Sequence, residues 1–363
     1  MNLFKDLEKK YTKNTMRAGD AQHLANEIAF APVVFQISRL MLKYDIFNYL
    51  YQSDDTGLTM ESIVEKTGLS TYAVKVLLEA SLSIRTVTID SEDNYHLSKV
   101  GWFLLNDEIV KANLNFNHDV NYKGLFYLDE ALETGKPSGL KVFGEWDTLY
   151  EGLSSLPKQV QDSWFGFDHF YSDNSFQEAL EIIFQSQPKR LLDVGGNTGR
   201  MATQCVNYDA NVEVTIMDLP QQIALMQKAV AEEPNKNRIN GHGANLLDLT
   251  VKVPTGFDVI WMSQFLDCFS EPEILHILQR TVASMNEATE LYIMETFWDR
   301  QKYETAAYCL TLTSVYFTAM ANGNSKMYHS DDFIKIIELA GLKIEKIHDE
   351  IGMGHTILKC TKA

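Results

Sequence analysis

Short apolar runs and amphipathic stretches alternate through the second half of the chain. The apolar runs predict strands at residues 191–194, 212–218, 239–247, 257–263, 290–295, 342–347 and 356–359. The last two flank a turn that contains Gly352 and Gly354, which indicates an antiparallel pair. A helix is predicted at 271–286, where Ile274 and Leu278 share one face. Strands that alternate with helices predict an α/β fold with a Rossmann-like, doubly wound sheet.

The first hundred residues have a different pattern. Apolar residues recur at helical spacing between 24 and 44, so we expect a long amphipathic helix that packs in its own domain or forms a subunit interface. Two shorter helices follow, with Thr59 and Ser70 as N-caps and Gly68 as the stop between them. The apolar runs 84–89 and 95–97 complete the pattern of a winged helix.

The tip of the predicted wing carries Asp90, Glu92 and Asp93, where a protein that binds DNA phosphates would carry Lys or Arg. We therefore expect a structural or dimerising domain. The predicted division is a mostly helical, winged-helix-like domain at 1–105, a helical linker and substrate-pocket region at 106–180, and a Rossmann-like domain at 181–363. Aromatic residues between Trp164 and Tyr171 either belong to the core or cover a pocket for a flat apolar substrate.

Charge and cysteine content narrow the possible partners. The 363 residues carry a formal charge of −17 and a pI near 4.9, which opposes binding to nucleic acid and to anionic membranes. The four cysteines include no C-x-x-C pair, so neither a zinc site nor a disulfide framework is expected. The sequence starts with a charged segment and has no apolar run long enough to span a membrane, so we expect a cytoplasmic protein.

A glycine turn follows the first predicted strand of the α/β domain. Gly195, Gly196 and Gly199 permit a tight turn with close approach of a ligand to the backbone. The spacing lacks the first glycine of the dinucleotide pattern, and Asp193 would repel a pyrophosphate but attract an ammonium or sulfonium group. Both features disfavour an NAD-dependent oxidoreductase.

Asp218 ends the second strand about 20 residues later, where such folds bind ribose hydroxyls. Together with this acid, the D-x-G-x-x-x-G pattern of Asp193, Gly195 and Gly199 resembles the S-adenosylmethionine-binding motif of Rossmann-like methyltransferases. The sequence thus predicts nucleoside binding at the ends of these two strands.

From about residue 25 to the end, the chain resembles the small-molecule O-methyltransferases, which include caffeic acid, acetylserotonin and polyketide-tailoring enzymes. The resemblance implies S-adenosyl-L-methionine as cofactor, a small aromatic acceptor and a homodimer held by the N-terminal domain. It also implies a cofactor pocket formed by Asp193, Gly195, Gly196, Gly199, Asp218, Leu219, Asn245, Leu246 and Ser263. Two positions depart from the family: Asn245 lies where a Gly-Asp pair is usual, and Ser263 lies where a Lys is frequent. Asn245 can still hydrogen-bond an adenine.

The departure in the catalytic loop is larger. The family's Leu-His-Asp-Trp is replaced here by Leu266, Asp267, Cys268 and Phe269, so Asp267 takes the place of the usual base. For a phenol of pKa near 10, proton transfer costs about 8 kcal/mol with an ordinary Asp, against about 5 with His. Asp267 is therefore a desolvated base, the acceptor is an acidic hydroxyl or an amine, or the protein is a catalytically silent homologue. Glu295, after the fifth strand, is a second catalytic candidate that could orient a base or a substrate.

Overall fold

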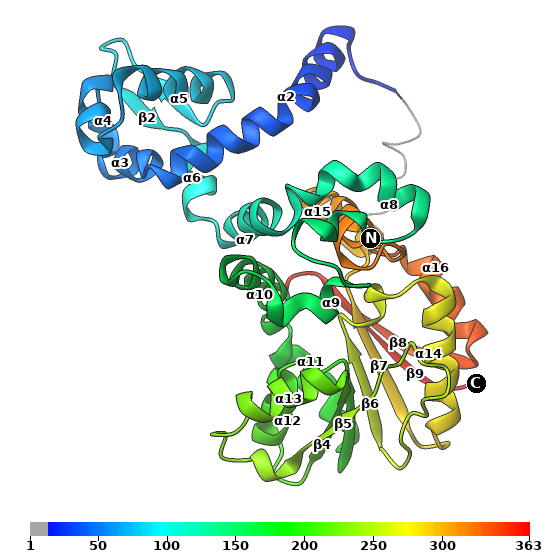
Figure 1. Cartoon of the computed structure of the whole chain (residues 1–363). Coiled ribbons are helices and arrows are strands. Elements are labelled where there is room, and N and C mark those ends of the chain that lie inside the picture. The colour runs from blue at the N-terminus through cyan, green and yellow to red at the C-terminus, as the bar shows by residue number, and fades with distance from the viewer. Residues whose placement is uncertain (1–13) are drawn as a thin grey trace. The chain divides into compact units, whose positions relative to one another are not determined.

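The computed structural model describes residues 14–363, which form two compact units, residues 14–118 and 119–363 (Figure 1). The elements of the first unit are α2 (Ala18–Lys43), α3 (Ile46–Gln52), α4 (Met60–Thr67), α5 (Thr71–Ser83), β1 (Val87–Ile89), β2 (Tyr95–Leu97), α6 (Lys99–Asn106) and α7 (Glu108–Phe116). A short 3-10 turn, Asp54–Thr56, precedes α4.

The predicted helix caps of the first unit are confirmed. The Thr59 hydroxyl accepts from the Ser62 amide at 3.2 Å, and Gly68 ends α4 with φ +68°. The Ser70 hydroxyl caps α5 in the same way. The first wing strand begins at residue 87 rather than 84, because the chain is still closing the last turn of α5: the amide of Ile84 donates to the Ala80 carbonyl.

The two halves of α2 differ in burial. From Val34 onward its apolar side chains enter the core of the first unit, where Met41 is fully buried. Residues 14–33 are exposed throughout, and they include Leu24, Ile28, Phe30 and Val33. The first half of α2 therefore presents large apolar side chains that no residue between 14 and 363 covers.

The second unit is built on one sheet. Within residues 119–363 its strands are β3 (Arg190–Val194), β4 (Glu213–Asp218), β5 (Ile239–Gly243), β6 (Val259–Ser263), β7 (Glu290–Glu295), β8 (Leu342–Ile351) and β9 (His355–Lys362). Their order is β5-β4-β3-β6-β7-β9-β8. The strands β3 to β7 are parallel, whereas β9 is antiparallel to β7 and to β8. This confirms the predicted fold class.

Helices cover both faces of this sheet (Figure 1). One face carries α11 (Phe176–Ile183), α12 (Arg200–Tyr208) and α13 (Pro220–Ala229), and the other carries α14 (Glu271–Ser284) and α16 (Ser330–Leu339). Successive residues of β3 point into different cores: Leu191 belongs to the same core as Val214, and Leu192 to the same core as Ile293. Burial on both faces explains the continuous apolar runs of the central strands.

The remaining helices of the second unit are α8 (Leu128–Thr134), α9 (Leu149–Gly152), α10 (Lys158–Asp173) and α15 (Glu304–Tyr316). Single turns of 3-10 or π geometry cover 117–121, 124–127, 138–142, 153–155, 184–186, 236–238, 266–268, 298–300 and 317–321. No helix between residues 14 and 363 combines the length and the apolar character that crossing a membrane requires.

The third strand of the sheet is shorter than predicted. It ends at Gly243 rather than at residue 247, because the Asn245 side-chain oxygen accepts from the Leu247 amide at 2.9 Å and turns the chain away. The closing pair is longer than predicted, since β8 extends to Ile351 and β9 begins at His355.

Candidate functional site

The carboxyl ends of four neighbouring parallel strands bring the predicted site residues together. Asp218 is the last residue of β4, Ser263 of β6 and Glu295 of β7, and Asp193 is the penultimate residue of β3. The strands lie in the order β4-β3-β6-β7, and their registers align these ends. The edge of the sheet thus carries two acids over β3 and β4 and a third over β7, as expected for ligand binding at the ends of parallel strands.

The turn after β3 depends on its glycines. Gly195 has φ +78°, and its amide donates to the Met217 carbonyl at 2.9 Å. A Cβ atom on Gly195 would lie 2.3 Å from the Phe265 ring, and one on Gly196 would lie 2.6 Å from Asp193 Oδ2. Gly199, with φ +82°, ends the turn immediately before α12. Side chains at these positions would strain the backbone or displace their neighbours.

Asp218 holds this turn from the neighbouring strand. Its Oδ2 accepts from the Asn197 amide at 2.9 Å, and its Oδ1 accepts from the Leu219 amide at 2.7 Å. Burial raises the pKa of the Asp218 carboxyl, although both amide bonds oppose that change. A carboxylate offers about four acceptor positions, so two remain for a ligand.

Asp193 is only 2% exposed, and its Oδ2 has no hydrogen-bond partner among residues 14–363. Burial, and to a smaller extent the charge of Asp218, raises the pKa of the Asp193 carboxyl to about 7. Two further buried oxygens also lack a donor among residues 14–363: Asn197 Oδ1, in the turn after β3, and Gln264 Oε1, directly after β6. Both residues have positive φ, 49° and 46°. Unpaired buried oxygens and backbone strain are the features expected where a ligand supplies the missing donors.

The residues predicted to face an adenine lie around the end of β5. The Ala244 amide donates to the backbone carbonyl of Asp218 at 2.8 Å, which brings this turn to the end of β4. Leu246 is buried, whereas Asn245 is exposed. Because Asn245 Oδ1 already accepts from the Leu247 amide, its Nδ2 is the group left to donate to a ligand.

The loop after β6 forms the other half of the site. Its single helical turn, Leu266–Cys268, carries Asp267, which is 7% exposed. The Cys268 thiol lies 3.5 Å from Asp267 Oδ1, and the Tyr150 hydroxyl donates to the Cys268 sulfur at 3.1 Å. Burial raises the pKa of the Asp267 carboxyl to about 6.

Glu295 fixes the backbone of this loop. Its Oε1 accepts from the Phe265 amide at 3.1 Å and from the Leu266 amide at 2.8 Å. Its Oε2 is buried, with no partner in the described part of the chain. Burial, followed by the charge of Asp267, raises the pKa of Glu295 well above its ordinary range. The shift favours the protonated form of Glu295, because a second negative charge beside Asp267 is unfavourable.

Three aromatic side chains, which we call the aromatic wall, surround the same loop: Tyr150, Trp164 and Tyr316. The Trp164 indole donates to the Tyr316 hydroxyl at 2.8 Å. The rings of Tyr150 and Trp164 meet edge to face, with centroids 6.5 Å apart. The sequence indicated that Trp164, and the predicted helix at 306–320 with Tyr316, either border the pocket or belong to the core. It gave no role to Tyr150, which lies on α9.

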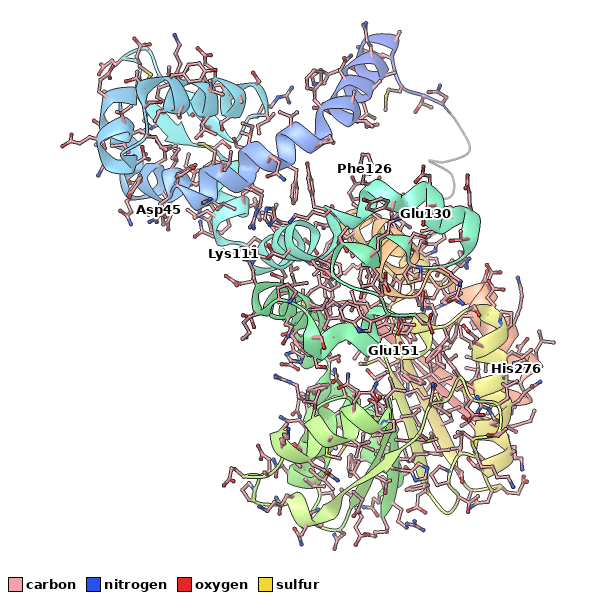
Figure 2. All side chains as sticks on the ribbon, viewed as in Figure 1. Asp45, Lys111, Phe126, Glu130, Glu151 and His276 are labelled. Atoms are coloured by element: carbon pink, nitrogen blue, oxygen red, sulfur yellow. The ribbon has the colours of Figure 1, made fainter. Side chains whose placement is uncertain are left out.

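An open pocket of about 700 Å³ lies next to a residue that supports this loop. Its lining includes Trp146, Glu151 and Asn322, and the Asn322 side chain donates to the backbone carbonyl of Cys268. Glu151, labelled in Figure 2, follows Tyr150 on α9. The pocket therefore shares residues with the supports of the Asp267 loop.

Comparisons with known proteins agree with this arrangement. Residues 22–95 match a Dimerisation2-like domain, and residues 172–343 match an O-methyltransferase domain. An L-tyrosine C(3)-methyltransferase of Streptomyces lavendulae is 23% identical over 322 residues, which are 88% of this chain and 86% of the relative.

Solved structures show the same fold. The S-adenosylmethionine-dependent methyltransferase SibL, in its apo form, superposes with a TM-score of 0.69 at 20% identity, over 93% of this chain and 98% of that one. The O-methyltransferase NcsB1 from neocarzinostatin biosynthesis, in complex with S-adenosylmethionine and 2-hydroxy-5-methyl naphthoic acid, gives a TM-score of 0.67 at 16% identity, over 91% and 96%. With a dimerisation domain ahead of an O-methyltransferase domain, the chain belongs to the S-adenosylmethionine-dependent small-molecule O-methyltransferases, as its sequence motifs predict.

Proposed function

We propose that the chain methylates a small aromatic acceptor at a hydroxyl group, with Asp267 as the base that removes the hydroxyl proton. The observation that carries this proposal is the burial of Asp267, 7% exposed, on a loop that Glu295 holds through the Phe265 and Leu266 amides. When bound, S-adenosylmethionine supplies the electrophilic methyl group. Asp267 would then act on the acceptor while the surrounding residues hold both molecules in line.

The residues at the ends of β3 and β4 fit this cofactor. Asp218 has two free acceptor positions for ribose hydroxyls, and the unpaired Asp193 Oδ2 suits an ammonium group. Around these two acids the pocket would consist of Gly195, Gly196, Gly199, Leu219, Asn245, Leu246 and Ser263. The glycines allow the backbone to approach the ligand, and Asn245 Nδ2 is free to donate to an adenine nitrogen.

The pKa of Asp267 decides whether it is a competent base. A phenol near pKa 10 and a carboxyl near 6 differ by about four units, or roughly 5–6 kcal/mol. For an ordinary Asp the difference is roughly 8 kcal/mol, and for an ordinary His roughly 5 kcal/mol. Burial therefore brings Asp267 close to the basicity of the histidine that it replaces. Glu295 would contribute by fixing the loop that carries Asp267.

The acceptor side of the proposed site is aromatic. Tyr150, Trp164 and Tyr316 suit a flat ring. The NcsB1 structure contains a hydroxylated naphthoic acid, and the relative from Streptomyces lavendulae is named for L-tyrosine. Both are hydroxyl-bearing aromatic compounds, which supports an acceptor of this class.

Methylation at a ring carbon is a second candidate. The relative that matches 88% of this chain is named as a methyltransferase for C(3) of L-tyrosine. Removal of the phenolic proton makes the neighbouring ring carbon nucleophilic, so Asp267 would serve as the base for this reaction too. NMR analysis of the methylated product separates the two reactions, because only one of them retains a free phenol.

A homodimer is the assembly that we propose. The exposed side chains of Leu24, Ile28, Phe30 and Val33 form an apolar stretch on α2. This stretch lies within residues 22–95, the part that matches a Dimerisation2-like domain. A second copy of the chain would cover these side chains.

The test of the proposed base compares Asp267→Asn with Asp267→His. The Asn variant should keep its affinity for the cofactor while kcat/KM falls by on the order of 10²- to 10⁴-fold. The His variant restores a base of the family's type and should recover much of the loss. With saturating cofactor, wild-type kcat should fall as the pH drops through about 6, because Asp267 becomes protonated. Unchanged turnover in Asp267→Asn would refute the proposed role.

A further inference from the structure

Asp168 is a carboxyl group at the site that the methyl transfer does not use. It lies on α10, four residues after Trp164, so the two side chains share one face of the helix. Trp164 belongs to the aromatic wall through its hydrogen bond to Tyr316. Burial first, and then the charge of Asp267, raises the pKa of Asp168 to about 7. Asp168 thus lies beside Trp164 of the aromatic wall, on the acceptor side of the site.

Asp168 is half-buried but forms neither a hydrogen bond nor an ion pair with any residue between 14 and 363. Arg200, whose charge acts on it, is already bonded to Asp173, with Nε 3.0 Å from Oδ1. The Arg200 side chain is also 49% exposed, so it does not neutralise the interior of the site. A carboxylate placed in this way remains available to a ligand.

An independent observation also indicates a polar ligand at this site. Glu295 is 1% exposed; its Oε1 accepts from two amides of the loop that carries Asp267, and its Oε2 has no partner in the described chain. The aromatic wall contains no basic side chain. The charge of Asp267 acts on both Asp168 and Glu295, so the acids here outnumber Arg200, the basic group whose charge acts on Asp168. Such a site attracts cations and repels anions.

We propose that the acceptor carries a protonated amino group in addition to its aromatic ring, and that Asp168 binds this group. The inference rests on the proposed methyl transfer at Asp267, because it specifies the substrate of that same site. An ammonium group offers three donors and is attracted both by a carboxylate and by aromatic faces. Asp168 would orient the ring so that its hydroxyl reaches Asp267.

A charge series of acceptors tests this inference by turnover. Tyramine, para-ethylphenol and para-hydroxyphenylpropionate share one phenol ring but carry a positive, neutral and negative tail, and the matching hydroxynaphthyl compounds repeat the series on a larger ring. At pH 8, where Asp168 is ionised, we expect kcat/KM to be highest for the compounds with a positive tail, lower for the neutral ones and lowest for the negative ones. Asp168→Asn should lower kcat/KM for the amines by on the order of 10- to 100-fold and change the neutral compounds by less than about threefold. The control is Asp162→Asn, an exposed acid on the same helix that pairs with Lys158.

Binding measurements separate this inference from the proposed chemistry. Calorimetry on protein saturated with S-adenosylhomocysteine needs no turnover, so it reports the preference for the amine even if Asp267 is not the base. Tighter binding of the amines than of the neutral compounds, lost in Asp168→Asn and kept in Asp162→Asn, supports the inference. Equal binding of the amine and neutral compounds overturns it. An equal loss for all three charges in Asp168→Asn also overturns it, because that pattern indicates a structural role.

Discussion

The buried carboxyl of Asp193 makes the stability of the ligand-free protein depend on pH. Its pKa is about 7 in the folded protein, against an ordinary value of 3.8. The folded state therefore holds this proton to a higher pH than the unfolded state does. Between pH 4 and pH 7 the unfolded chain binds fewer protons, so the contribution of Asp193 to the free energy of unfolding falls as the pH rises. Asp193→Asn lacks this titration.

The magnitude follows from the two pKa values. Between pH 5 and pH 8.5, the Asp193 contribution to the free energy of unfolding changes only up to the folded pKa of about 7, that is, over about two pH units. At about 1.36 kcal/mol per unit this is roughly 2–3 kcal/mol. The difference in unfolding free energy, variant minus wild type, should grow by this amount across that range. Urea unfolding at several pH values measures it, and the other titrating groups cancel in the difference. Asp147→Asn, which changes an exposed aspartate in a loop, provides the control.

Cofactor binding extends the same argument. If Asp193 pairs with an ammonium group, the affinity for S-adenosylhomocysteine should rise as the pH increases through about 7 and Asp193 loses its proton. In Asp193→Asn the affinity should be lower and this dependence should be absent. A stability difference that stays constant from pH 5 to pH 8.5 would show that Asp193 is not the titrating group. A wild-type affinity without pH dependence would remove it from the cofactor site.

Two further predictions concern the cofactor site and the proposed dimer. Asp218→Ala should weaken cofactor binding by roughly 1.5–3 kcal/mol in calorimetry. It should also destabilise the ligand-free protein, because the Asn197 and Leu219 amides lose their acceptor. An affinity equal to that of the wild type would contradict the role given to Asp218. Ile28→Asp places a charge on the exposed apolar stretch of α2. It should convert a dimer into monomers in light scattering without lowering the melting temperature. A dimer that survives this change would point to another interface.

The parts of the fold that sequence predicted best are those where local chemistry and burial agree. The strands that end at Asp218 and Glu295 are buried on both faces, so their apolar runs reveal them directly. The caps at Thr59 and Ser70 are local hydrogen bonds, and they form as their spacing predicts. The predicted end of β5, residue 247, was wrong because an apolar pair, Leu246 and Leu247, continues past the point where Asn245 turns the chain.

The acceptor side of the site was harder to predict from sequence. Tyr150, Trp164 and Tyr316 belong to three helices, and only the tertiary fold brings their hydrogen bonds to the loop of Asp267. The sequence identified Asp267 by its position in the loop, yet it could not supply the burial that sets its pKa. Asp168 had no sequence signal, because an isolated acid on an amphipathic helix usually faces solvent.

The pairing of Asp267 with Glu295 leads to a prediction that tests the charge state of the site. If Glu295 is protonated at neutral pH, Glu295→Gln replaces one neutral group by another and keeps an oxygen for the Phe265 and Leu266 amides. The acidic limb of the kcat profile, set by Asp267, should then stay within about half a unit of its wild-type position. If Glu295 were ionised, its charge would repel that of Asp267; for like charges about 4 Å apart at an effective dielectric of about 20, this repulsion is roughly 4 kcal/mol. Removal of the Glu295 charge in Glu295→Gln would then lower the pKa of Asp267 by about three units. A large downward move of the limb in Glu295→Gln would therefore place the charge on Glu295, and Asp267 would then owe its basicity to repulsion rather than to burial.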